Sequence, residues 1–104
     1  MVSAIRRKDE ATQRIEAVLK RHFPGGEPEA YRYGDYSHVI RLRVIDRSFD
    51  GKPWIERHEC VERYLADLPD DLRADITMLV LVTPDELKDS MVNREFENPS
   101  RSLL

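Results

Sequence analysis

The pattern of hydrophobic and polar positions changes its period several times along this chain. The first stretch has the period of a helix, with one apolar stripe at helical spacing: Ala11, Ile15, Val18 and Leu19. The run Pro24-Gly25-Gly26 ends it, because proline cannot continue the helical hydrogen bonds and glycine accepts the backbone angles of a helix end. The pattern predicts an amphipathic helix from about Ser3 to His22.

The next stretch has the period of a strand. Ile40, Leu42 and Val44 share one face, and Arg41 and Arg43 share the other. The residues Gly34 to Ser37 suit a tight connection, so we expect a hairpin with arms Ala30–Tyr33 and His38–Ile45. One face of its second arm then packs on helices, and the other meets water or a ligand.

The helical period returns at the corner Phe49–His58. Gly51 can take backbone angles that a side chain forbids, and Pro53 suits the first position of a helix. Apolar residues then recur at helical spacing: Trp54, Val61, Leu65 and Leu68. We expect a helix from Pro53 to Leu68, ended by Pro69, with one short turn at Asp70–Arg73.

The last apolar segment, Ile76–Val82, is almost unbroken and rich in β-branched residues. Such a run is typical of a strand covered on both faces or lying centrally, and we expect it to be the innermost strand of the sheet. Thr83-Pro84-Asp85-Glu86 is a capping box that starts a last helix carrying Leu87 and Met91. From Asn93 onward the chain is polar.

These elements predict an α+β fold in the order α-β-β-α-(short helix)-β-α. We expect a three-stranded mixed sheet with helices on one face. A chain of 104 residues suffices for one modest core, so we place a single domain at residues 1–92 and a polar tail at 93–104.

Composition narrows the possible functions. The net charge of −3 argues against coating nucleic acid through bulk electrostatics, although a local basic face remains possible. The single cysteine, Cys60, cannot form an internal disulfide and suits a reducing cytosol. The sequence has no secretory signal and no run of the roughly 18 apolar residues that a membrane helix needs. We therefore expect a cytoplasmic protein.

The residue pattern does not predict an enzyme. Ser37 and His38 are neighbours on a strand and point in opposite directions, so they cannot form a nucleophile and base pair. Cys60 lies beside Glu59 and Glu62, whose negative charges disfavour a reactive thiolate.

Two surfaces are candidates for binding. On the strand face, Arg41 and Arg43 with Arg32, or with Tyr31 and Tyr33, would form a basic and aromatic platform for single-stranded nucleic acid, unless the face is simply solvated. At the corner, the residue types that most often anchor protein partners occur together: Arg47, Lys52, Trp54 and Arg57. His58 is either a partly buried structural histidine or a recognition residue.

The corner and its flanks resemble the BolA family. The resemblance covers about Tyr31 to Leu87 and is carried by Phe49-x-Gly51, Arg57-His58, Val61 and Thr83-Pro84-x-Glu86, together with the order of helices and strands. It implies a fold like the second type of KH domain and non-enzymatic roles. These roles are partnering monothiol glutaredoxins around a shared iron–sulfur cluster, or binding DNA as a regulator.

Two departures from the family pattern shape our expectation. The family's cluster-ligating histidine lies where this chain has Asp75-Ile76-Thr77-Met78, and a carboxylate is a poorer ligand for iron–sulfur iron than imidazole. His38 alone matches the second, variable ligand position and is the one candidate metal ligand. The second departure is Leu87, where the family has a tryptophan after the Thr-Pro-x-Glu run. RNA binding of the KH type is not supported either, because the glycine-rich clamp of KH domains is replaced by the acidic run Leu68-Pro69-Asp70-Asp71.

We therefore predict a cytoplasmic binding or regulatory adaptor without a strongly held cofactor. Its expected partner is a protein of the monothiol glutaredoxin type, contacted by Lys52, Trp54, Arg57 and His58. The alternative is a nucleic-acid-binding regulator that uses Arg41, Arg43, Lys52 and Arg57.

Overall fold

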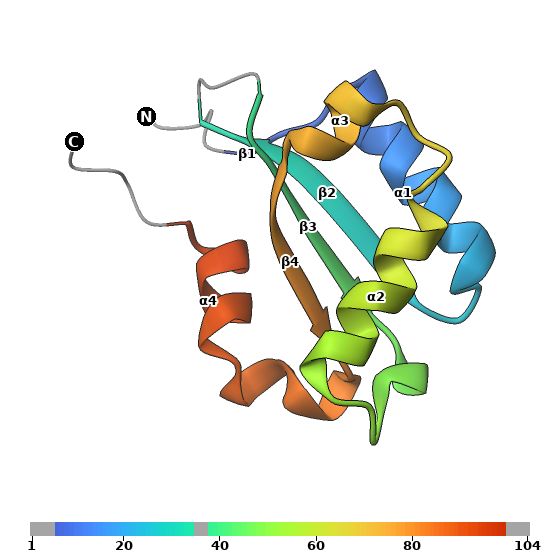
Figure 1. Ribbon diagram of the computed structural model, residues 1–104. Coiled ribbons are helices and arrows are strands. Elements are labelled where there is room, and N and C mark those ends of the chain that lie inside the picture. The colour runs from blue at the N-terminus through green and yellow to red at the C-terminus, as the bar shows by residue number, and fades with distance from the viewer. Residues whose placement is uncertain (1–5, 35–37, 100–104) are drawn as a thin grey trace.

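The structure is a computed structural model that describes residues 6–34 and 38–99. Every helix in this described part of the chain falls short of the length and apolar character that crossing a membrane requires. The elements follow one another as shown in Figure 1: β1 (Arg6–Arg7), α1 (Glu10–His22), β2 (Glu27–Tyr33), β3 (Ile40–Ile45), the 3-10 turn η2 (Arg47–Phe49), α2 (Trp54–Tyr64), α3 (Asp70–Ala74), β4 (Ile76–Val82), the 3-10 turn η3 (Pro84–Asp89) and α4 (Met91–Glu97).

One mixed sheet contains the strands in the order β1-β2-β3-β4. β2 is antiparallel to both β1 and β3, and β4 is parallel to β3. The α+β class is confirmed, but the sheet has four strands instead of the expected three. The additional strand is β1, in which Arg6 pairs with Tyr33 and Arg7 with Arg32. Two residues are too few to show a period of two, so the pattern could not reveal this strand.

The first helix begins later than its pattern suggested. α1 starts at Glu10 instead of near Ser3, and residues 3–5 lie outside the described part of the chain. Asp9 is the N-cap: its carboxylate accepts from the Thr12 amide, and the Thr12 hydroxyl accepts from the Asp9 amide. This reciprocal pair satisfies two amides that a helix start leaves unbonded, which fixes the beginning of the helix.

Helices cover both faces of the sheet, not one (Figure 1). On the first face, α1, α2 and α3 lie over a core that includes Ile15, Leu19, Leu42, Val44, Val61 and Leu65. On the second face, α4 covers a smaller cluster: Tyr31, Ile45, Val80, Val82 and Phe96. The expectation of helices on one face is therefore wrong for α4. Alternate residues of β4 are apolar on both sides, so each side requires a cover.

The apolar strand β4 lies at an edge of the sheet, next to β3. The expectation that it is innermost is wrong, whereas its alternative, a strand covered on both faces, is confirmed. Leu79 and Leu81 face the first core, and Met78 and Val80 face the second. An unbroken apolar run reports that both faces are buried, and it carries no information on whether both edges are paired.

The packed domain extends beyond residue 92. α4 continues to Glu97, the side chain of Phe96 is fully buried, and the Tyr31 hydroxyl donates to the Phe96 carbonyl over 2.6 Å. The boundary placed before Asn93 is therefore too early, and residues 100–104 lie outside the described part of the chain. Phe96 is one aromatic residue in an otherwise polar segment, so the polarity averaged over that segment does not reveal its buried contact.

Replacing Phe96 by alanine should lower the free energy of unfolding by about 3–5 kcal/mol, because the substitution leaves a cavity beside Tyr31 and Val80. Chemical denaturation followed by circular dichroism measures the change. The matched control is Met91→Ala on the same helix: its side chain is 77% exposed, so the change should stay within about 0.5 kcal/mol. Equal small effects of both substitutions would show that α4 is not part of the cooperative unit.

Candidate functional site

The corner between β3 and α2 is held by a turn and a buried ring. Gly51 has a φ of +78°, in the left-handed region that favours glycine. Phe49 is buried in the first core and fixes the turn to the body of the protein. Pro53 is the N-cap of α2, so the helix starts one residue later than expected. The corner therefore presents the first turn of α2 at a fixed angle.

Arg57 connects the corner to the end of the sheet. Its Nε donates to the Lys52 carbonyl over 2.9 Å, and one terminal nitrogen donates to the Leu81 carbonyl over 2.9 Å. The two terminal nitrogens also bind both carboxylate oxygens of Glu86, at 2.7 and 3.0 Å. Only 11% of the Arg57 side chain is exposed. A bidentate pair of this kind fixes orientation as well as supplying energy, so Arg57 is a structural clamp.

The charges of this clamp stabilise one another. The hydrogen bonds from Arg57 lower the pKa of Glu86, with a further contribution from the Thr83 amide that the carboxylate accepts. The hydrogen bonds to Glu86 raise the pKa of Arg57. Both groups are therefore ionised near neutral pH, and the contact is an ion pair there.

The outer face of α2 exposes an apolar surface beside the clamp. Trp54 is 65% exposed and Ile55 is 58% exposed. The ring of His58, which is half-buried, lies 4.1 Å from the Trp54 ring, centroid to centroid. These side chains line a shallow concavity together with Glu59, Glu62 and Arg63. Trp54 does not join the core stripe, because the core beneath α2 is built from later residues such as Val61 and Leu65.

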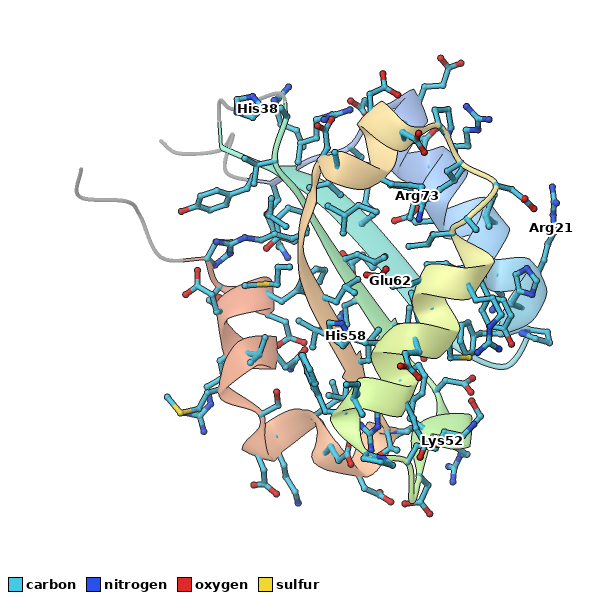
Figure 2. All side chains as sticks on the ribbon, in the orientation of Figure 1. Arg21, His38, Lys52, His58, Glu62 and Arg73 are labelled. Carbon is cyan, nitrogen blue, oxygen red and sulfur yellow. The ribbon has the colours of Figure 1, made fainter. Side chains whose placement is uncertain are left out.

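The structure brings the four predicted contact residues together but gives them different environments. Lys52 is exposed at the tip of the corner (Figure 2), Trp54 is exposed at the start of α2, and His58, one turn later, is half-buried. Arg57 points inward. Sequence reasoning missed Ile55, although two adjacent large apolar residues cannot both face the core of one helix. It also missed the role of Glu86 as the partner of Arg57, because a long-range pair leaves no trace in local spacing.

The predicted basic sheet face is covered in the structure. Arg41 pairs with Glu95 at 3.0 Å and lies over the Tyr33 ring at 3.9 Å. Arg43 pairs with Glu97 at 2.7 Å and Glu29 at 3.0 Å. The expectation of an open basic platform is therefore wrong. α4 lies across this face, and carboxylates of α4 neutralise Arg41 and Arg43. Strand alternation placed the arginines on one face correctly and could not show which chain segment covers that face.

The residues at the family's cluster position do not fit an iron–sulfur cluster. Asp75 stands there, and its carboxylate lies 3.4 Å from Arg32, so it is a hard oxygen donor already engaged with a cation. His38 lies at the end of the sheet remote from His58 (Figure 2). Among the described residues, no group of three or more histidine, cysteine, aspartate or glutamate side chains could hold a metal ion.

Replacing Glu86 by glutamine should lower the free energy of unfolding at pH 7 by about 1 kcal/mol, a value reduced for the partial exposure of the pair. The pKa of Glu86 in the folded state is below its ordinary value of 4.5, so its stabilisation is complete above that pH and disappears as the pH falls below it. The difference between wild type and variant should vanish in acid. Denaturation from pH 7 to pH 2 tests this.

The control for this experiment is Asp85→Asn, a neighbouring exposed carboxylate outside the Arg57 clamp. Its effect should stay within about 0.5 kcal/mol throughout the pH range. A Glu86→Gln difference that persists unchanged below pH 3 would contradict an ion pair as its cause.

Comparison with known proteins agrees with the fold. No family model matches the chain. No curated protein matches it either. Among solved structures, BolA1 from Arabidopsis thaliana is similar, with 19% sequence identity and a TM-score of 0.56. The similarity covers 76% of this chain and 98% of the BolA1 chain. The chain therefore has a BolA-like fold, as the resemblance of its corner predicted.

Proposed function

We propose that this protein is a non-enzymatic adaptor that binds a protein partner through the outer face of α2. The observation that carries the proposal is the exposure of two adjacent large apolar side chains, Trp54 and Ile55, at 65% and 58%. Tryptophan is one of the residues that most often dominate binding energy in interfaces. A partner that covers this pair removes apolar surface from water, which favours association.

This surface is ordered before binding. His58 packs against the Trp54 ring, and the hydrogen bonds of Arg57 to Lys52 and Glu86 hold the first turn of α2 in place. A side chain that is already restricted loses less conformational entropy when a partner arrives. The contact residues of the proposal are Lys52, Trp54, Ile55 and His58, and Arg57 positions them.

The partner class follows from the BolA-like fold together with the residues of this chain. A monothiol glutaredoxin in the cytoplasm is the partner that the resemblance supports. The complex should form without a histidine-ligated shared cluster, because the residue at the ligand position is Asp75, which pairs with Arg32. Binding then depends on surface contact, which suits a regulatory adaptor.

The nucleic-acid alternative gains no support from the charges. Three of its four residues bind carboxylates within the described part of the chain: Arg41 with Glu95, Arg43 with Glu97 and Glu29, and Arg57 with Glu86. A guanidinium that a carboxylate already neutralises adds little positive charge to displace the cations condensed on a nucleic acid, and the release of those cations is the main source of such binding. Lys52 alone does not make a phosphate-binding surface.

Replacing Trp54 by alanine should weaken binding to a monothiol glutaredoxin by about 30-fold or more, the loss expected for a residue worth about 2 kcal/mol in an interface. Isothermal titration calorimetry measures it. Met91→Ala is the matched control, because Met91 is also exposed, at 77%, but lies on α4. Its affinity should equal that of wild type. Absence of binding by the wild-type protein, or equal affinities of all three proteins, would refute the proposal.

The same mixture tests cluster ligation after iron–sulfur reconstitution. We expect a complex whose absorption spectrum lacks the features of a histidine-ligated shared cluster and does not change in His38→Ala. His58→Ala should weaken the complex without altering the spectrum, because His58 supports Trp54 through ring contact. A cluster spectrum that is lost in His38→Ala would show that His38 is a ligand after all.

A further inference from the structure

The outer edge of β4 has backbone groups that point away from the sheet. The Val82 carbonyl accepts from the Asp46 amide, so the backbone of Val82 faces β3. Backbone groups alternate in direction along a strand, and the N–H and C=O groups of Leu79 and Leu81 therefore point outward. Such a row of groups is a template for another extended chain.

Only part of this edge is closed by the protein itself. The Leu81 carbonyl accepts from Arg57 over 2.9 Å, which caps the C-terminal end of the strand. Toward the other end Thr77 is exposed and Leu79 is half-buried. The segment Ile76–Val82 contains no charged residue and no proline, which are the usual means of protecting an edge. The opposite edge strand, β1, has only two residues, and both are arginines.

A groove lies beside the open part of the edge. It has a volume of about 300 Å³, an apolar lining from Leu65, Ile76 and Leu79, and charged side chains from Glu62, Asp70 and Arg73. Glu62 projects from α2 toward the sheet, and Arg73 lies on α3 above it (Figure 2). The groove is therefore bounded by two helices and a strand edge.

The charge of the groove is negative. Arg73 lies 3.4 Å from Asp70, so these two charges offset one another. Glu62 makes no ion pair with any residue in the described ranges 6–34 and 38–99, and Glu59 lies one turn before it on α2. A basic side chain at this place gains an ion pair, whereas a phosphate group is repelled.

We propose that the β4 edge binds an extended segment of a protein partner as an additional strand. The backbone of the segment pairs with Leu79, an apolar side chain enters the groove over Leu65 and Ile76, and a basic side chain meets Glu62. Binding by strand addition takes affinity from main-chain hydrogen bonds and specificity from alternate side chains. This site adjoins the Trp54 surface and shares Glu62 with it, but Trp54 and Ile55 do not line the groove and the strand-pairing groups belong to β4.

A second copy of this chain fits the edge less well than a basic segment. Two copies that pair antiparallel about a two-fold axis near Leu79 present the same residues to each other. Since Glu62 and Leu79 line the same groove, this arrangement brings the two Glu62 carboxylates toward one another. Like charges in that position oppose association.

The test uses as its probe an acetylated heptapeptide of the order Lys-Thr-Val-Thr-Lys-Thr-Val, in which the lysines and valines share one face of an extended strand. NMR titration of the full chain should shift the backbone amides from Ile76 to Leu79 and that of Glu62. Hydrogen exchange of the Leu79 amide should slow at least tenfold at saturation, because the amide gains an acceptor. The same peptide with every amide N-methylated should not bind, since it has no backbone donors. Equal binding of the methylated peptide, or no binding of the unmodified one, would overturn the proposal.

Charge variants test the ion pair. Glu62→Lys should weaken binding of the lysine–valine peptide by about two- to fivefold, whereas Asp67→Lys, an exposed charge reversal outside the groove, should leave it unchanged. A glutamate–valine peptide that binds as tightly would refute the charge argument. A dimer in sedimentation that protects the Leu79 amide without peptide would show that a second copy occupies the edge instead. Trp54→Ala should not alter peptide affinity, so failure here is distinguishable from failure of the glutaredoxin proposal.

Discussion

The hydrogen bonds of the Arg57 guanidinium are the constraint on which the proposed binding surfaces depend. They join segments that are far apart in the sequence: the corner at Lys52, the end of β4 at Leu81 and the turn η3 at Glu86. Each acceptor is a carbonyl or carboxylate that would otherwise need water. Because one planar group satisfies all of them, the direction of α2 is tied to the end of the sheet and to the point at which the chain departs toward α4.

The same group lies beside the two surfaces that we propose for binding. By turning Arg57 inward, α2 leaves Trp54 and Ile55 on its outer side. By accepting from Arg57, the Leu81 carbonyl withdraws from the free edge of β4, and strand addition is confined to the region around Leu79. Arg57, which the sequence suggested as a contact residue, is therefore the residue that positions the proposed contact surfaces.

The sequence predicted what is local and could not predict what depends on distant segments. The period of residues 40–45 gave β3 and placed Arg41 and Arg43 on one face, and the capping box at Thr83 and Glu86 is present. That α4 covers those arginines depends on Glu95 and Glu97, which look like ordinary solvated charges in a polar run. Whether a sheet face with this pattern is open or covered therefore depends on which distant segment packs against it.

Asp75, in the segment where the BolA resemblance implies a histidine ligand, has a structural role in this chain. Arg32 binds both Asp75, which precedes β4, and Asp9, the N-cap of α1. The start of β4 is thereby fastened to β2 and to the first helix, and both carboxylates depend on the same cation. A metal or cluster at Asp75 would have to break this link and leave Arg32 partly buried without one of its anions, which is costly. Partner binding at the proposed α2 face or β4 edge would leave this link intact, because neither Arg32 nor Asp75 lines the groove or the Trp54 concavity.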